Sequence, residues 1–284
     1  MIFRKRKITA QKSITTKAAR RGKRVITLAL DKRQKFVIGV LVLSIFLFLS
    51  EFQFGKSGIV IASFLAILTD GILYLAIKED LKDNFSLSIF ILPFFYSLAF
   101  GLFYFLIPTR LLFRLAQTTL YAVGLYSLFL SENIFTVSSI RTIALLSGAR
   151  IVSFVLTLLS YFFLTNIIYS LHLTIFLIIP LLVIYTFPLI YQSLWTYNMQ
   201  KTQGLMGEWA GVLTLCIVET AIVVWFWPST PTITSLFLAG FFYMLVGLSH
   251  VWFERRLFKN VMWEYMWVGV IVFFVLLLFT PWGK

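Results

Sequence analysis

Long runs of apolar residues, separated by short polar loops, repeat along the chain from Phe36 to its end. Most runs are about 20 residues long, the length of helix that crosses a hydrocarbon layer about 30 Å thick. Backbone inside a membrane must satisfy its own hydrogen bonds, and runs this long and continuous fit helices better than barrel strands. The pattern predicts nine membrane-spanning helices, over residues 36–50, 59–77, 86–107, 109–130, 151–169, 173–191, 210–227, 233–252 and 261–280.

Two features interrupt this regular pattern. Pro93, Pro180 and Pro188 fall inside predicted spans, where the missing N–H is expected to kink a helix or break it. Residues 131–150 carry scattered polar side chains between two spans, and the Ser-Glu-Asn sequence at 131–133 is suited to capping a helix. This segment is therefore expected either to lie along the inner membrane interface or to extend the fifth span.

Positive charge is concentrated before the first span. The first 35 residues hold 13 of the 25 Lys and Arg residues and a single acidic residue, Asp31. Cytoplasmic loops of membrane proteins carry an excess of Lys and Arg. With nine spans and a cytoplasmic N-terminus, 21 of these residues fall inside and four outside, a sharper separation than eight or ten spans give. The charges predict a cytoplasmic N-terminus, an external C-terminus, a basic tail over residues 1–35 and a helical transmembrane domain over residues 36–284.

Composition supports the same fold class. The chain is 60% hydrophobic and 13% charged, whereas a soluble domain has about a quarter of its residues charged. We therefore predict an all-α, polytopic membrane helix bundle. The lone cysteine, Cys216, excludes an internal disulfide, and His172 and His250 are too few for a haem or a metal cluster. No cofactor and no metal site are expected, and His250 is expected at the inner interface.

The basic tail indicates the partners to expect. Its Lys and Arg residues would attract anionic lipid headgroups of the bilayer, each contributing about 1 kcal/mol near the surface. The same charges also serve as a topology signal that keeps the N-terminus inside, so both roles stay open. Phe3 is the one aromatic residue of the tail, and no nucleic-acid binding is expected because such binding uses aromatic stacking. Short loops fit a bacterial cytoplasmic membrane, with organelle membranes as the alternative, and the oligomeric state is left open.

Ionisable side chains within the spans offer the main candidate chemistry. A charge at the centre of a membrane helix costs at least about 2.5–3.5 kcal/mol, so it normally faces protein or water. Asp70 lies in the second predicted span and Glu219 at the middle of the seventh. Both carboxylates are expected to face the bundle interior, as proton or cation sites.

The fourth predicted span carries a polar stripe. Arg114, Gln117, Thr118 and Tyr121 are spaced i, i+3, i+4 and i+7, which places them on one helix face. We expect this stripe to line a cavity and Arg114 to pair with Asp70 or Glu219. Arg141, beyond the same span, is a further candidate. The alternative is a buried polar cluster that only fixes how the helices pack.

Three classes of function remain. The first is a small-solute or ion transporter of the permease type that uses the intramembrane carboxylates. The second is a membrane assembly or scaffold protein with a lipid-binding tail. The third is a membrane-embedded enzyme acting on lipid-linked substrates, but the chain has no HExxH, no G-x-S motif with a His partner and no paired Asp motif. We therefore expect no catalytic residues, and we favour transport.

Overall fold

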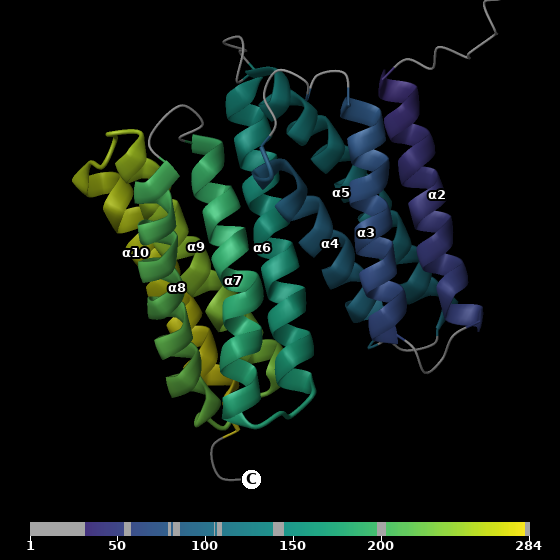
Figure 1. The fold of residues 1–284 in the computed structure, drawn as a ribbon. Helices are drawn as coiled ribbons and strands as arrows, with labels where there is room; N and C mark the ends of the chain where they lie inside the picture. Colours follow the sequence, from purple (N-terminus) through teal and green to yellow (C-terminus); the bar gives the residue numbers. More distant parts are fainter. Residues whose placement is uncertain are drawn as a thin grey trace, which may run out of the picture. The chain divides into compact units, whose positions relative to one another are not determined.

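The computed structural model describes residues 32–53, 58–78, 81, 86–104, 106, 110–138, 145–197 and 203–281, which form helices and short connections without a strand. Nine helices make up this part of the chain (Figure 1). In chain order they are α2 (Lys32–Gln53), α3 (Gly58–Ile77), α4 (Ser88–Tyr104), α5 (Leu111–Ser138), α6 (Leu146–Ser170), α7 (Ile175–Tyr197), α8 (Gln203–Trp225), α9 (Pro231–Phe253) and α10 (Lys259–Phe279). The chain divides between residues 35 and 36 into two units, and the helices from Phe36 onward form the second.

Each helix coincides with one predicted span, and the prediction of an all-α membrane helix bundle is confirmed. Eight of the described helices are long and apolar enough to cross a membrane. The remaining helix, α4, has 17 residues, which is the lower limit for a span. It packs against α3, α5, α6 and α7, so it lies inside the bundle and has little contact with lipid.

Successive helices run in opposite directions (Figure 1). The end of the bundle at which α5, α7 and α9 finish and α6 and α10 begin is called the inner end, because the loop charges predict that it faces the cytoplasm. The opposite end is called the outer end. Described cations near the inner end include Lys78, Arg150, Arg255, Arg256 and Lys259. Those near the outer end include Arg110 and Arg114.

The segment between the fourth and fifth spans agrees with its prediction only in part, because residues 146–150 extend the fifth span as one alternative expected, while residues 131–138 extend the fourth. Helix α5 continues without interruption through residues 131–133 to Ser138. Ser131 donates its hydroxyl hydrogen bond to the backbone oxygen of Ser127 inside the same helix, at 2.9 Å, instead of capping a new one. Helix α6 starts at Leu146, earlier than its span was predicted to start. Helix α7 also continues across both Pro180 and Pro188, so it is not broken.

Helix α10 packs closely against α9 at Gly240 and Gly247. A Cβ at Gly240 would lie 2.6 Å from Cγ2 of Val272, and one at Gly247 would overlap the ring of Tyr265. The missing side chains therefore let α10 approach α9 closely, as small residues do in membrane helix pairs. Leu276 is the one buried residue of α10, so most of this helix surface is free to face lipid.

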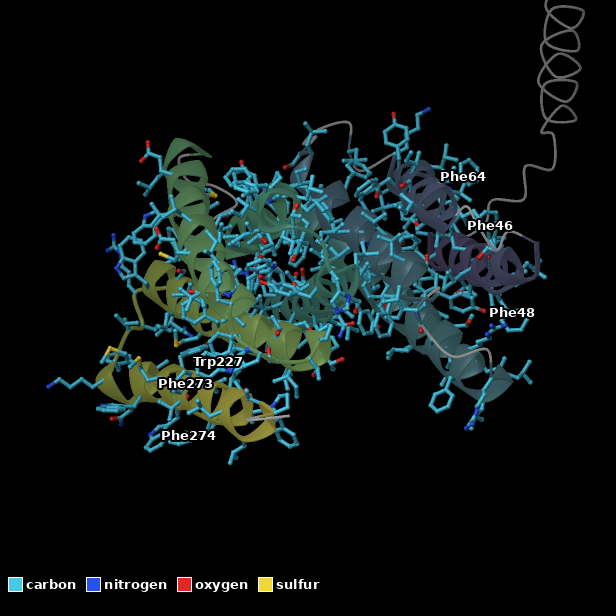
Figure 2. All side chains as sticks on the ribbon, turned by 90° about the horizontal axis from the view of Figure 1, so that it is seen from below. Phe46, Phe48, Phe64, Trp227, Phe273 and Phe274 are labelled. Atoms are coloured by element: carbon cyan, nitrogen blue, oxygen red, sulfur yellow. The ribbon has the colours of Figure 1, made fainter. Side chains whose placement is uncertain are left out.

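Apolar side chains cover the outside of the bundle, and polar atoms gather between the helices (Figure 2). Phe64, Phe273 and Phe274 point away from their helices and are 54%, 47% and 56% exposed. This inside-out distribution is the one expected when the surrounding solvent is lipid.

Candidate functional site

The most deeply buried carboxyl group of the described chain belongs to Glu132 on α5. Its side chain is 0% exposed. It occupies a position in the buried stripe of α5, where Leu125, Phe129 and Thr136 precede and follow it at helical spacing. The helix therefore turns Glu132 into the bundle with the same face that carries its apolar core residues.

Glu132 meets side chains from two other helices. Gln192 of α7 donates a hydrogen bond from Nε2 to Oε1 of Glu132, at 3.3 Å. The same Nε2 lies 3.4 Å from the hydroxyl oxygen of Ser153 on α6. Gln192 is 0% exposed and Ser153 is buried. Three helices thus meet at one polar point in the inner half of the bundle.

Two oxygens at this point have no donor in the described part of the chain. They are Oε2 of Glu132 and Oε1 of Gln192. An unpaired buried acceptor costs about 1–3 kcal/mol, and such groups call for an explanation because most buried polar atoms are hydrogen-bonded. The site therefore has two unpaired hydrogen-bond acceptors and no N–H or O–H donor for them among the described residues.

Asp70 on α3 is the second carboxyl of this region. It is partly buried, and its Oδ1 has no hydrogen-bond partner among the described residues. Asp70 lies seven residues before the end of α3 and Glu132 six residues before the end of α5, so both carboxyl groups are in the inner half of the bundle. The interior orientation predicted for Asp70 agrees with this placement, but the second carboxyl was not predicted.

Hydroxyl groups next to Asp70 connect three helices. Thr69 of α3 lies 2.8 Å from the hydroxyl of Ser97 on α4, which lies 3.1 Å from the hydroxyl of Tyr121 on α5. One turn before Tyr121, Gln117 donates from Nε2 to the backbone oxygen of Phe100 at 3.2 Å. These bonds hold α3, α4 and α5 together on the outer side of Glu132.

The polar stripe of the fourth span is only partly interior. Gln117 and Tyr121 are buried, whereas Thr118 and Arg114 are half-buried. Thr118 donates to the backbone oxygen of Arg114 at 2.9 Å.

The predicted ion pair of Arg114 with Asp70 or Glu219 does not form among the described residues. Arg114 lies 18 residues before Glu132 on α5, a distance of about 27 Å along the helix, so it belongs to the outer end.

The structure contradicts the interior orientation predicted for Glu219. Its side chain is exposed on α8, in a stripe with Val212, Leu215 and Val223. The physical reason is that α8 is apolar on all sides, so no polar stripe in the sequence distinguishes its interior face from its lipid face. Arg141, the remaining candidate, lies outside the described residues.

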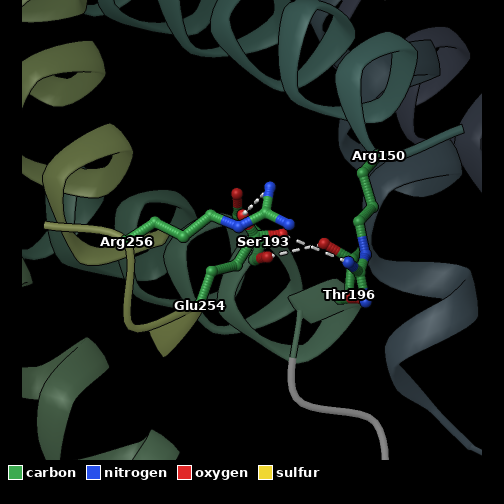
Figure 3. Close-up of polar contacts among 5 residues, drawn as sticks. All are labelled: Arg150, Ser193, Thr196, Glu254 and Arg256. Atoms are coloured by element: carbon green, nitrogen blue, oxygen red, sulfur yellow. Dashed lines mark hydrogen bonds and ion pairs between the residues drawn. The ribbon is translucent and has the colours of Figure 1, made fainter. Parts of the chain in front are cut away.

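Arg150 joins three helices at the inner end (Figure 3). It donates from Nε to the backbone oxygen of Thr196 on α7 at 2.9 Å, and its Nη1 lies 3.4 Å from Oε1 of Glu254 after α9. Arg256 is 3.9 Å from the other carboxylate oxygen. The Arg150 guanidinium also lies 4.7 Å from the ring centroid of Tyr197, in reach of a cation–π attraction.

His250 lies one helical turn before Glu254. It was predicted to lie at the interface, but the structure buries it. It is 4% exposed, and its Nε2 is 3.0 Å from the hydroxyl of Ser193. Its ring stacks on Tyr197 with centroids 4.0 Å apart. The helix position of His250, on the face that α9 turns toward α6 and α7, is what removes it from the surface.

Glu132 and Gln192 are the residues that sequence reasoning missed. Ser-Glu-Asn at 131–133 matches a sequence that caps a helix start. A second pattern, which indicates that the helix continues, is present in the same residues. Glu132 follows Leu125 by seven residues and Phe129 by three, which is the spacing of a continuing helix face. The partner Gln192 lies 60 residues away, and no local pattern connects the two.

Comparison with known proteins identifies a family. A family model described as "Protein of unknown function (DUF5656)" matches residues 41–279, from within α2 to the end of α10. No curated protein and no solved structure matches the chain.

Proposed function

The chain belongs to the DUF5656 family, whose description assigns no activity, and we propose from its interior site that it is an ion transporter that carries protons across the membrane. In this proposal Glu132 binds and releases the transported proton, and Asp70 is its partner carboxyl.

The observation that carries the proposal is the environment of Glu132. Its carboxyl group is 0% exposed, accepts one neutral hydrogen bond from Gln192, and is ion-paired with no Lys or Arg of the described residues. An ionised carboxylate in such surroundings costs several kcal/mol. A proton on Glu132 removes the charge and supplies the O–H donor that the two unpaired oxygens lack.

Asp70, the second carboxyl in the inner half of the bundle, favours proton exchange at the site over permanent protonation. Two carboxyl groups close together in a low-dielectric interior do not ionise independently, and one holds its proton more firmly than the other. A movement that changes their separation or their access to water would therefore change the number of protons that the pair holds. Intramembrane carboxyl groups serve as proton relays in pumps and transporters in this way.

A proton fits this site better than a divalent cation. Calcium and magnesium take about six oxygen ligands, and the described residues contain no group of three His, Cys, Asp or Glu side chains suited to a metal. A proton needs one carboxyl oxygen and one acceptor, and Glu132 with Gln192 supplies both. Sodium and potassium are the remaining competitors, and the experiment below includes them.

Proton flux into vesicles tests the proposal. The purified chain is reconstituted into liposomes that contain a pH-sensitive dye, and an outward potassium gradient with valinomycin drives protons inward. We expect the wild type to acidify the lumen faster than protein-free liposomes and Glu132→Gln to lose this activity. Glu219→Gln is the matched control, because Glu219 is also a carboxyl on a bundle helix but is exposed on α8, outside the bundle interior. It is expected to keep wild-type flux.

Three results would contradict the proposal. The first is proton flux in wild-type vesicles equal to that in protein-free ones under both a pH gradient and a potential, which removes the transport activity. The second is full proton flux in Glu132→Gln, which removes the role of the site. The third is sodium or potassium flux that depends on Glu132 while proton flux does not, which changes the transported ion.

A further inference from the structure

A file of buried polar side chains follows α6 from the site of Glu132 toward the outer end. Ser153, Thr157 and Ser160 are spaced i, i+4 and i+7 on one face, and each is at most 2% exposed. Their continuation along the helix is Tyr161, Thr165 and Tyr169, all of them buried. From Ser153 to Tyr169 the file spans 16 residues, about 24 Å of helix, which is most of a hydrocarbon layer about 30 Å thick.

Helix α7 completes the file from the opposite side. Tyr185 lies seven residues before Gln192, so both project from the same face of α7. The hydroxyls of Tyr185 and Thr165 are 2.8 Å apart. Tyr161 lies beside this pair, with its ring centroid 5.5 Å from that of Tyr185. The interface of α6 and α7 therefore carries polar side chains over several turns.

Two hydroxyls in the middle of the file have no hydrogen-bond partner among the described residues. They are the phenol of Tyr161 and Oγ1 of Thr186, and both side chains are 0% exposed. Thr157, Ser160 and Thr165 each donate to a backbone oxygen of their own helix. Their oxygens keep lone pairs that can accept a further hydrogen bond. The file thus combines unused donors with unused acceptors, the condition under which buried water binds.

The outer end of the file opens on a cavity of about 260 Å³ between the ends of α6, α7, α8 and α9. Tyr169 belongs to both, since it lines the cavity and follows Thr165 by one helical turn. The other lining residues include hydroxyl and aromatic side chains from α8, α9 and the connection between them, among them Trp225, Trp227, Ser229 and Thr234. Asn166 of α6 is buried nearby and donates to the hydroxyls of Thr232 and Ser235 on α9, at 3.2 Å each.

We infer that this file binds water and connects the outer cavity to Glu132 as its proton path. The inference rests on the proposed function, because it gives the proton of Glu132 a route from the outer side. Water molecules between the hydroxyls would relay the proton, each oxygen receiving one hydrogen and passing on another, with no net chemical change. Glu132 lies close to the inner end of α5, so only the outer route needs a long path.

Silver ions test access to the file without any transport assay. In a Cys216→Ala background, which removes the native thiol, Thr186→Cys places a thiol in the middle of the file. Leu73→Cys is the matched control, because Leu73 is also 0% exposed but lies on α3, outside the file between α6 and α7. The ion is added to reconstituted protein, and thiols that remain free are labelled after denaturation. We expect silver to block Thr186→Cys roughly tenfold faster than Leu73→Cys.

Flux measurements test whether the same file conducts protons. Tyr161→Phe and Thr186→Val each remove a hydroxyl that makes no hydrogen bond in the structure, so packing is expected to survive. Losing one water-binding group should slow proton flux roughly tenfold. Thr119→Val is the control, because the exposed Thr119 bonds only to the backbone of its own helix, at 2.7 Å. It is expected to leave flux unchanged.

The combined results separate failure of the path from failure of the function. If Glu132→Gln abolishes flux while Thr186→Cys reacts as slowly as Leu73→Cys and Thr186→Val conducts normally, the path is wrong and the function stands. If wild-type flux is absent, the function is wrong, and silver access alone decides whether water enters the file. Fast silver access with slowed flux in both hydroxyl variants supports the path.

Discussion

Replacing Glu132 with glutamine is expected to stabilise the fold while it removes function. Oε2 of Glu132 and Oε1 of Gln192 are both buried acceptors without a donor among the described residues. Glutamine has nearly the same size as glutamate, carries no charge, and brings two N–H donors to this position. The side-chain amide of the variant can therefore donate to Oε1 of Gln192, a bond that the carboxylate cannot make.

The magnitude follows from the cost of the unpaired groups. Each unsatisfied buried acceptor costs about 1–3 kcal/mol, but hydrogen bonds between membrane helices contribute only about 0.6 kcal/mol on average. Relative to the ionised Glu132, satisfying one acceptor and removing one buried charge should together raise the free energy of unfolding by about 1 kcal/mol. Relative to the protonated Glu132, whose O–H already supplies the donor, the glutamine variant should be about equally stable. Glu219→Gln is the control, because a substitution on the exposed face of α8 is expected to stay within about 0.5 kcal/mol.

Reversible unfolding in mixed detergent micelles, followed by tryptophan fluorescence, measures this difference. The prediction requires Glu132→Gln to be at least as stable as the wild type at neutral pH. A variant less stable by more than about 1 kcal/mol would refute the reasoning, because it would mean that the Glu132 charge is held by a stabilising partner. A stable variant also ensures that its loss of proton flux reflects lost chemistry and not misfolding.

Three further outcomes are expected. Gly124→Ala would place its Cβ on the hydroxyl of Tyr96, so overpacking should lower the free energy of unfolding by about 1–3 kcal/mol. Gly211→Ala is the control, because the space around Gly211 is open and the free energy of unfolding should change little. A double-mutant cycle of Arg150→Met and Glu254→Gln should give a coupling energy below about 1 kcal/mol, because the ion pair is partly exposed to solvent. A coupling energy well above that value in the same unfolding assay would contradict the prediction. A peptide of residues 1–24, which holds ten Lys and Arg residues, should sediment with vesicles that contain anionic lipid and dissociate as salt rises; equal binding to neutral vesicles would refute the role of charge.

The number and direction of the helices could be predicted because a single physical constraint governs them. A span must be apolar over about 20 residues, and this constraint acts on consecutive residues, so it is visible in the sequence. The prolines of α7 were expected to kink or break that helix, yet it continues across both. Neighbouring helices and local adjustments can satisfy the backbone groups that a proline leaves free in a membrane.

Which face of each helix turns inward was predictable only where polar residues mark it. Gln117 and Tyr121 form a polar stripe, and both are buried as their spacing predicts. Glu219 has apolar neighbours on every side, so its sequence context carries no information about orientation. The carboxyl that does lie inside, Glu132, follows a serine and precedes an asparagine, and this local sequence resembles a helix start.

The contacts that define the candidate site depend on the tertiary arrangement. Gln192 and Glu132 are 60 residues apart, and Arg150 and Glu254 are 104 residues apart. No periodicity within one helix relates such pairs, because their meeting depends on how α5, α6, α7 and α9 pack against one another. The hydroxyl file between α6 and α7 needs the same knowledge, although its spacing along α6 alone is regular.

Infrared difference spectroscopy of the reconstituted protein tests the central claim most directly. A carboxyl group that binds and releases a proton shows a carbonyl stretch of the protonated acid that appears and disappears as pH is changed. The account predicts such a band in the wild type and in Glu219→Gln, and its loss in Glu132→Gln. A pH-dependent band that survives unchanged in Glu132→Gln, or a wild type without any such band, would contradict the assignment of Glu132 as the proton site.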